Sequence, residues 1–102
     1  MKEYDVFIPL YYNDGKPVEA SKFQDLQSRL LEQFEGLTYF PQPNKGFWKF
    51  GDMSYQDEIV IYRVISQDPA GARDFLVKLK AWLREQFKQK EILIIEREIG
   101  VL

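Results

Sequence analysis

The sequence predicts an α+β fold in which four strands and two helices follow one another in the order β-α-β-β-α-β. Runs rich in β-branched and aromatic residues occupy 4–12, 37–50, 58–65 and 92–99. Apolar residues recur at helical spacing over 19–35 and 69–89, so a helix is expected after the first run and after the third. Glycine, proline, asparagine and aspartate separate most of these segments, as expected for turns.

The first strand and the first helix have clear local signals. The strand, 4–12 (YDVFIPLYY), ends at the turn residues 13–15 (NDG). From Glu19 the apolar period becomes that of a helix, with apolar residues at Phe23, Leu26, Leu30 and Phe34. Gly36 is placed to adopt the left-handed conformation that ends many helices.

The second strand, 37–50, contains Pro41 and Pro43. Because proline has no N–H to donate, a central strand is excluded here. We expect either an edge strand interrupted by a bulge, which is favoured, or two short strands flanking a loop. The chain then turns over 51–57. The third strand, 58–65 (EIVIYRVI), is nearly apolar on both faces and is expected at the centre of the sheet.

The second helix begins at a recognisable start signal. Asp68 is expected to be the N-cap and Pro69 the first helical residue. The buried stripe of this helix is expected at Phe75, Leu76, Leu79, Trp82, Leu83 and Phe87. The last strand, 92–99 (ILIIEREI), ends in charged residues.

The order of elements most often folds as a ferredoxin-like split βαβ unit, which is an antiparallel four-stranded sheet with two helices on one face. Right-handed crossovers place the first and third strands in the centre, in agreement with their apolar character. The second and fourth strands are then the edges. Because 102 residues contain no low-complexity linker, we expect a single α+β domain over 1–102.

The composition excludes several kinds of chemistry. The 102 residues include no cysteine and no histidine, so zinc sites built from them, a thiol nucleophile and a histidine general base are excluded. We predict no metal site and no cofactor. Fourteen basic and sixteen acidic residues give a net charge of -2, which offers little attraction for a nucleic-acid backbone. The charged start (MKEYD) and the lack of an apolar run of about 20 residues predict a cytoplasmic protein that does not enter a membrane.

One octamer, 45–52 (KGFWKFGD), begins like the aromatic motif of RNA-recognition domains. That motif continues with a small residue and a further aromatic residue, where this chain has Trp48 and Lys49. The octamer also precedes the predicted central strand instead of forming it. Binding of single-stranded RNA is therefore the least favoured hypothesis, and we interpret the octamer as part of an edge strand.

Three short motifs occur in order through about the middle third of the chain: 34–38 (FEGLT), 46–48 (GFW) and Glu58 before the third strand. This series resembles a family of small bacterial ferredoxin-like domains of unknown function, which carry F-x-G-L-T, then G-x-W, then E before a strand. The resemblance implies the same fold and a bacterial protein. It implies no activity, because none is assigned to the family.

The predicted strands are apolar on both faces. Alternate residues form the sets Val6, Ile8, Leu10 and Phe7, Pro9, Tyr11 in the first strand, and Ile59, Ile61, Ile65 and Val60, Tyr62, Val64 in the third. Because the helices cover one face only, the other face exposes more apolar area than soluble monomers usually do. We therefore predict a homodimeric binding or scaffolding module, in which a second copy covers this face about a two-fold axis.

Six residues are candidates for a ligand or interface site: Tyr11, Tyr39, Trp48, Glu58, Tyr62 and Arg63. The two charged residues either bind a polar ligand or, as favoured, Glu58 lies at the sheet rim and Arg63 pairs with an acidic residue across the sheet or the dimer contact. The aromatic residues either line a pocket for a flat ligand or, as favoured, pack in the core and interface. The alternative function is that of a small-ligand carrier or cofactor-free enzyme of the dimeric α+β barrel type.

Overall fold

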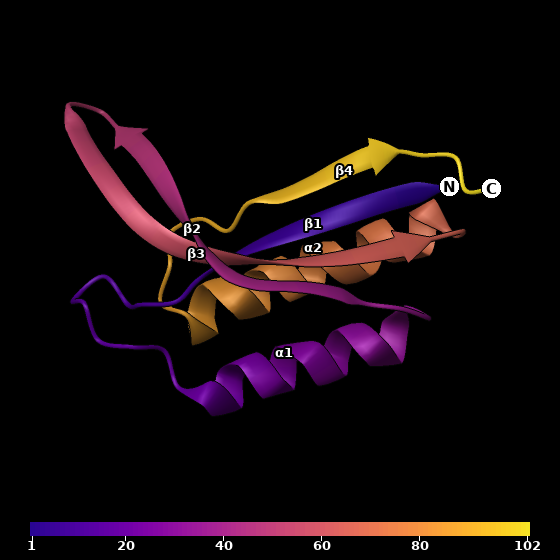
Figure 1. The fold of residues 1–102 in the computed structure, drawn as a ribbon, viewed down its shortest axis with the longest axis horizontal. Coiled ribbons are helices and arrows are strands. Elements are labelled where there is room, and N and C mark those ends of the chain that lie inside the picture. Colours follow the sequence, from indigo (N-terminus) through magenta and orange to yellow (C-terminus); the bar gives the residue numbers. More distant parts are fainter.

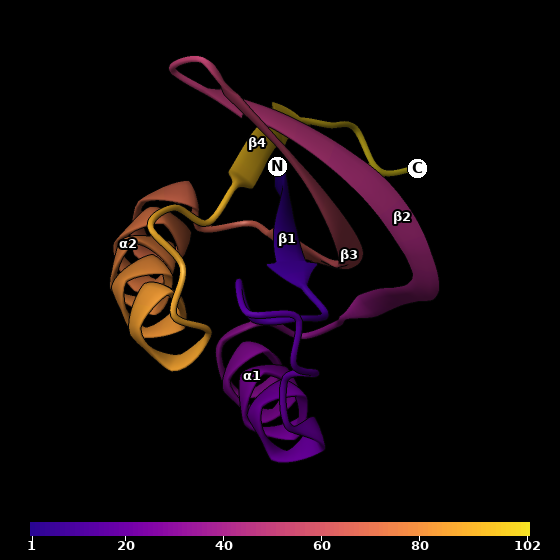
Figure 2. The same cartoon turned by 90° about the vertical axis from the view of Figure 1, so that its left-hand side faces the viewer.

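The computed structural model of the chain describes residues 1–102, apart from the side chain of Phe50. The elements are β1 (Lys2–Pro9), α1 (Ala20–Gln33), β2 (Thr38–Phe50), β3 (Met53–Ser66), α2 (Pro69–Gln86) and β4 (Ile94–Glu98). The strands pair antiparallel in the order β2-β3-β1-β4, and both helices lie on one face of the sheet (Figures 1 and 2). This is the predicted ferredoxin-like fold, with β1 and β3 at the centre. Neither described helix is long and apolar enough to cross a membrane.

The register of the strands divides the side chains between two faces. Tyr4, Val6 and Ile8 of β1 lie opposite Val64, Tyr62 and Val60 of β3, and all six are buried beneath the helices. Neighbouring residues on a strand point to opposite faces. The face turned away from the helices, hereafter the open face, therefore carries Glu3, Asp5 and Phe7 of β1, Ile59, Ile61, Arg63 and Ile65 of β3, Phe40 and Trp48 of β2, and Ile95 and Arg97 of β4.

The core lies between the sheet and the helices. From the helices it receives Leu26, Leu30, Ala72, Leu76, Leu79 and Leu83, all of which are buried. Burying a leucine side chain of this kind stabilises the fold by about 2 kcal/mol. Trp82 is only half-buried, and its ring lies 4.1 Å from the guanidinium of Arg29 on α1. The helical period therefore predicted the buried stripe of α2, with Trp82 at its margin.

β2 is one edge strand with a bulge, as favoured by its two prolines. The register shifts between Phe40, which lies opposite Ile61, and Asn44, which lies opposite Ile59. Three residues of β2, including both prolines, thus stand opposite one residue of β3. A bulge at a sheet edge accommodates residues that cannot donate to the ladder.

The hairpin of β2 and β3 is longer than predicted. A turn was expected over 51–57, but β3 begins at Met53 and only Gly51 and Asp52 form the loop. Gly51 has a φ of 63°, and a two-residue hairpin loop favours glycine at such a position. Because β1 ends at Pro9, opposite Ile59, the hairpin residues 44–58 extend beyond the sheet as an arm (Figure 1). This arm covers no core, so its strands need no apolar alternation.

The helix ends follow the predicted signals in part. The Gly71 N–H donates to Asp68 Oδ1 at 3.2 Å, and Pro69 is the first helical residue, so the predicted start of α2 is confirmed. The predicted end of α1 is wrong. Phe34 caps this helix in an extended conformation, and Gly36 is not among the described glycines with positive φ. The chain leaves the helix at Phe34, whose ring is buried in the core.

Candidate functional site on the open face

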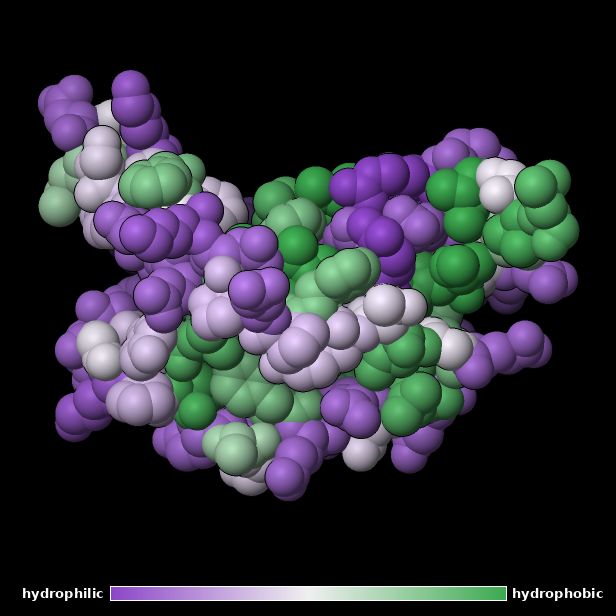
Figure 3. All heavy atoms as spheres, viewed as in Figure 1, coloured by the Kyte–Doolittle hydropathy of each residue, from purple (hydrophilic) through white to green (hydrophobic). Residues whose placement is uncertain are grey.

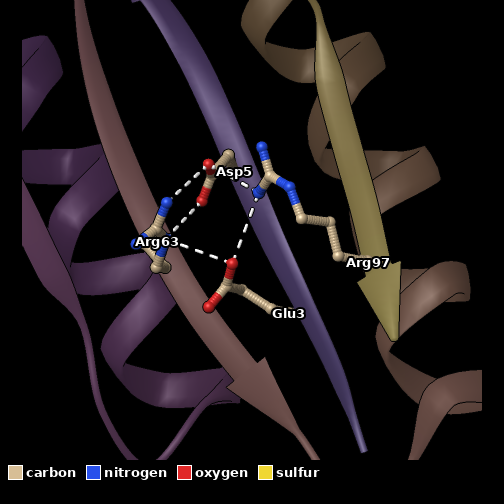
Figure 4. Close-up of polar contacts among 4 residues, drawn as sticks. All are labelled: Glu3, Asp5, Arg63 and Arg97. Atoms are coloured by element: carbon tan, nitrogen blue, oxygen red, sulfur yellow. Dashed lines mark hydrogen bonds and ion pairs between the residues drawn. The ribbon is translucent and has the colours of Figure 1, made fainter. Parts of the chain in front are cut away.

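Four charged side chains from three strands meet on the open face (Figure 4). Asp5 of β1 accepts hydrogen bonds from Arg63 Nε at 2.8 Å, Arg63 Nη2 at 3.0 Å and Arg97 Nη1 at 2.8 Å. Glu3 Oε1 lies 3.3 Å from Arg97 Nη1 and 3.4 Å from Arg63 Nε. These four residues are hereafter the charge cluster. Asp5 is thus the acidic residue across the sheet with which Arg63 pairs.

The sheet register produces the charge cluster. Asp5 lies directly opposite Arg63 on β3 and Ile95 on β4, while Glu3 lies opposite Arg97. Residues opposite or diagonal to one another on adjacent strands are within reach of long side chains. Hydrogen bonds from Arg63 and Arg97 hold the pKa of Asp5 below its ordinary value, and Asp5 raises the pKa of Arg63. Asp5 and Arg63 therefore form a charged pair at neutral pH.

The charge cluster has an inner acidic layer and an outer basic one. The side chain of Asp5 is 3% exposed and that of Glu3 is 15% exposed, whereas those of Arg63 and Arg97 are 35% and 43% exposed. Among the described residues, no other carboxylate lies within ion-pair distance of these two guanidinium groups. The end of the open face away from the arm therefore presents N–H donors outward, although the four charges sum to zero.

Apolar side chains surround the charge cluster. Phe40 lies beside Arg63, whose guanidinium carbon is 5.0 Å from the ring centre. Phe7, Ile61 and Ile95 are half-buried, and Ile65 is 43% exposed. The open face thus carries the apolar side chains that alternation along the strands predicted. The charge cluster as a whole was not predicted.

A groove of about 740 Å³ opens at the end of the open face nearest the arm. Its lining includes the aromatic and apolar side chains Phe7, Pro9, Tyr11, Trp48, Tyr55 and Leu93. The lining also includes Asp57, Glu58, Lys90 and Glu91, and because Glu91 pairs with Lys80 at 2.8 Å, two carboxylates stand against one ammonium group. Figure 3 shows the recess that separates the arm from the rest of the surface. The groove is therefore aromatic and acidic.

A hydrogen-bonded group at the end of α2 fixes the chain that forms one wall of this groove. Lys22 Nζ donates to Tyr12 Oη at 2.6 Å and to the Gln86 carbonyl oxygen at 2.7 Å, and Tyr12 Oη donates to Glu19. The Tyr12 hydroxyl holds the pKa of Glu19 below its ordinary value. Tyr12 itself lines the groove, so this group ties the groove wall to both helices.

The structure divides the six candidate residues between two faces. Tyr11, Trp48 and Glu58 line the groove, and Arg63 belongs to the charge cluster on the open face. Tyr39 and Tyr62 instead lie opposite one another on the face that the helices cover, with their rings stacked at 4.6 Å. Burial raises the pKa of Tyr62 above its ordinary value, so its hydroxyl stays protonated. Asp5, Glu3 and Arg97 were not among the candidates.

No family model matches the chain, and no curated protein matches it. Its fold is similar to that of solved structures. A phage SAM lyase in complex with S-methyl-5'-thioadenosine aligns with a TM-score of 0.73 and 16% identity, over 95% of this chain and 80% of that one. A phage SAM lyase in the apo state aligns with a TM-score of 0.72 and 16% identity, over 95% of this chain and 79% of that one. A point mutant of CutA1 from Pyrococcus horikoshii OT3 aligns with a TM-score of 0.67 and 10% identity, over 100% of this chain and 86% of that one. At these identities the likeness is one of fold alone.

Proposed function

We propose that this chain is a homo-oligomeric binding module whose open face packs against a second copy, in its simplest form as a homodimer. The supporting observation is the apolar surface on the open face, which includes the exposed or half-buried side chains of Phe40, Ile61, Ile65 and Ile95. Soluble monomers seldom expose a contiguous apolar patch larger than a few hundred Å². A second copy is the simplest cover, because a two-fold axis lets one surface cover itself.

The charge cluster is compatible with burial in such an interface. An isolated charge would oppose burial strongly, but Asp5 already accepts three hydrogen bonds and lies almost wholly out of solvent. The cost of desolvation is therefore largely met within each copy. Only the outward N–H groups of Arg63 and Arg97 require acceptors from the partner.

The cell location and family belong to the same proposal. A cytoplasmic location is part of this proposal, and the motifs FEGLT, GFW and Glu58 motivate membership in the bacterial ferredoxin-like family described above. The family resemblance is independent of the self-association, because none of its motifs contributes to the charge cluster.

Sedimentation at micromolar concentration tests the self-association. We expect a particle of twice 12.2 kDa. Ile61→Lys places a charge in the middle of the open face and is expected to give a folded monomer. Val77→Lys on α2, where the side chain is 70% exposed, is the matched control and is expected to leave the mass unchanged. A wild-type chain that stays monomeric up to about 100 μM, a concentration at which Kd values in the micromolar range give dimers, contradicts the proposal.

The groove favours a second function, the binding of a flat, positively charged small molecule. Tyr11, Trp48 and Tyr55 offer aromatic faces, and Asp57 and Glu58 place carboxylates beside them. Aromatic faces and carboxylates together attract an organic cation. The fold likeness to a phage SAM lyase, solved with S-methyl-5'-thioadenosine, suggests an adenosine that carries sulfur as the first ligand to test.

The test compares S-adenosylmethionine, which carries a sulfonium cation, with neutral S-methyl-5'-thioadenosine. We expect the cation to raise the thermal midpoint more and to change the fluorescence of Trp48, measured in a Trp82→Phe background. Trp48→Phe and Tyr55→Ala are expected to weaken the binding, whereas Tyr39→Ala, outside the groove, is not. Following the loss of S-adenosylmethionine in the same samples distinguishes an enzyme from a carrier. No response to either compound at millimolar concentration contradicts this second function.

A further inference from the structure

The open face presents outward guanidinium N–H donors toward one end and a carboxylate toward the other. Arg63 and Arg97 present guanidinium groups away from the arm, while Asp57 lies where the arm leaves the sheet. Asp57 shares the face of Ile59, Ile61 and Arg63, because alternate residues of β3 point to the same side. No ion pair among the described residues includes Asp57. The Asp57 carboxylate, hereafter the acidic end, is thus free to contact the outward guanidinium groups of Arg63 and Arg97, hereafter the basic end, on another copy.

The spacing between the ends makes the surface complementary to itself. Six residues separate Asp57 from Arg63 along β3, a distance of about 20 Å at about 3.3 Å per residue. The side chains of Ile59 and Ile61 lie between them, and Phe7 lies opposite Ile61 on β1. A two-fold axis through this apolar middle exchanges the two ends. It places the acidic end of one copy on the basic end of the other.

The shape of the arm suits this arrangement. Figure 1 shows the arm rising from the sheet on the side away from the helices. An arm that rises toward a facing copy reaches over that copy's sheet instead of pointing into solvent. The exposed arm side chains Met53 and Tyr55, which point to the same side as Asp57, would then find apolar contacts on the partner.

We propose that the open faces of two copies pack antiparallel about a two-fold axis, with the Asp57 carboxylate of each copy against the Arg63 and Arg97 guanidinium groups of the other. This inference rests on the proposed self-association and specifies its orientation. The partner is a second copy because the same surface supplies both the acidic and the basic end. Packing in the parallel orientation sets the arginines of one copy against those of the other. Such like-charge contacts are unfavourable, so they disfavour the parallel arrangement relative to the antiparallel one.

Charge reversal with rescue tests the contact. Asp57→Arg and Arg97→Glu are each expected to weaken dimerisation at least tenfold, because each creates two like-charge contacts per dimer. In an equal mixture of the two variants, one contact is native, and in the other the introduced arginine lies against the introduced glutamate and the unchanged Arg63. We expect the mixture to form a heterodimer that is tighter than the homodimer of either variant. Asp74→Arg, the same charge change on α2 on the far side of the sheet from the open face, is the control and is expected to dimerise as wild type does.

A second series keeps the test decisive if Arg97→Glu fails to fold. Dimer affinity is expected to fall in the order wild type, Asp57→Asn, Asp57→Arg, with circular dichroism confirming that each variant is folded. Equal affinities across this series, or no rescue in a mixture of folded variants, overturn the antiparallel contact while leaving self-association in place. A rescued particle of three or more copies also overturns the two-fold geometry. A wild-type chain that is always monomeric overturns both proposals.

Discussion

Asp5 accepts two hydrogen bonds from the guanidinium of Arg63, the residue directly opposite it on β3, at 2.8 and 3.0 Å. The pair lies on the face that the helices leave uncovered, yet Asp5 is only 2% exposed. A nearly buried carboxylate on an outer sheet face is stable only while its arginine partners remain. The charge cluster is therefore both a structural element of the monomer and one end of the proposed interface.

Removing the charge of Asp5 should destabilise the chain. Asp5→Asn leaves two guanidinium groups without their shared carboxylate, and we expect a loss of about 2 to 3 kcal/mol in the free energy of unfolding. Asp25→Asn is the control. It removes an exposed i,i+4 pair with Arg29 and should cost less than about 0.5 kcal/mol. Urea unfolding at one fixed chain concentration measures both, and equal losses contradict the structural role of Asp5.

The contribution of Asp5 should disappear in acid. Arg63 from β3 and Arg97 from β4 face Asp5, with Glu3 beside it on β1, and the arginines hold its folded pKa below the ordinary 3.8. A lowered folded pKa adds stability above the unfolded pKa and loses it as the pH falls through the folded value. The difference between wild type and Asp5→Asn should stay constant from about pH 7 to about pH 5 and shrink below about pH 4. Urea midpoints across this range measure it, and a difference that persists to about pH 2 would count against the ion pair.

Two adjacent leucines on α1 should respond differently to truncation. Leu30 is fully buried, so Leu30→Ala leaves a cavity and is expected to cost about 3 kcal/mol. Leu31 is 49% exposed, so Leu31→Ala should change stability by less than about 0.5 kcal/mol. Urea unfolding of the two variants tests which side of α1 packs against the sheet. Similar losses would mean that α1 is rotated from the described orientation.

The arm should depend on the glycine at its tip. Gly51 has positive φ, and alanine in that conformation costs about 1 to 2 kcal/mol. We expect Gly51→Ala to speed amide hydrogen exchange over residues 44–58 and not in β1. Gly36→Ala is the control, because Gly36 lacks positive φ and a Cβ there meets no atom within 4 Å. Unchanged exchange in the arm of Gly51→Ala contradicts the two-residue turn.

Local patterns in the sequence predicted most of the fold. Asp68 and Pro69 mark the start of α2 because capping involves only neighbouring residues. The central position of β3 followed from its apolar residues on both faces, and the bulge of β2 from Pro41 and Pro43. The arm was missed because residues 53–57 are largely polar, and a strand that covers no core carries no alternating signal.

The candidate site was predictable only in part, because its geometry depends on how distant strands align. Arg63 stood out as a charge within an apolar strand, but its pairing with Asp5 and the contact of Asp5 with Arg97 require the register of three strands. Asp5 carries the same signal, a single charge between Tyr4 and Val6. Tyr62 and Arg63 could have been assigned to opposite faces of the sheet from the sequence alone, since adjacent residues on a strand point to opposite faces.

The mass of the chain in solution, measured by sedimentation equilibrium from about 1 to about 100 μM, tests the covered open face most directly. The proposed pairing predicts a particle of twice 12.2 kDa over the upper part of this range, reduced to a monomer by Ile61→Lys. A mass of 12.2 kDa at every concentration would mean that the apolar open face is exposed to water, and it would contradict the central claim.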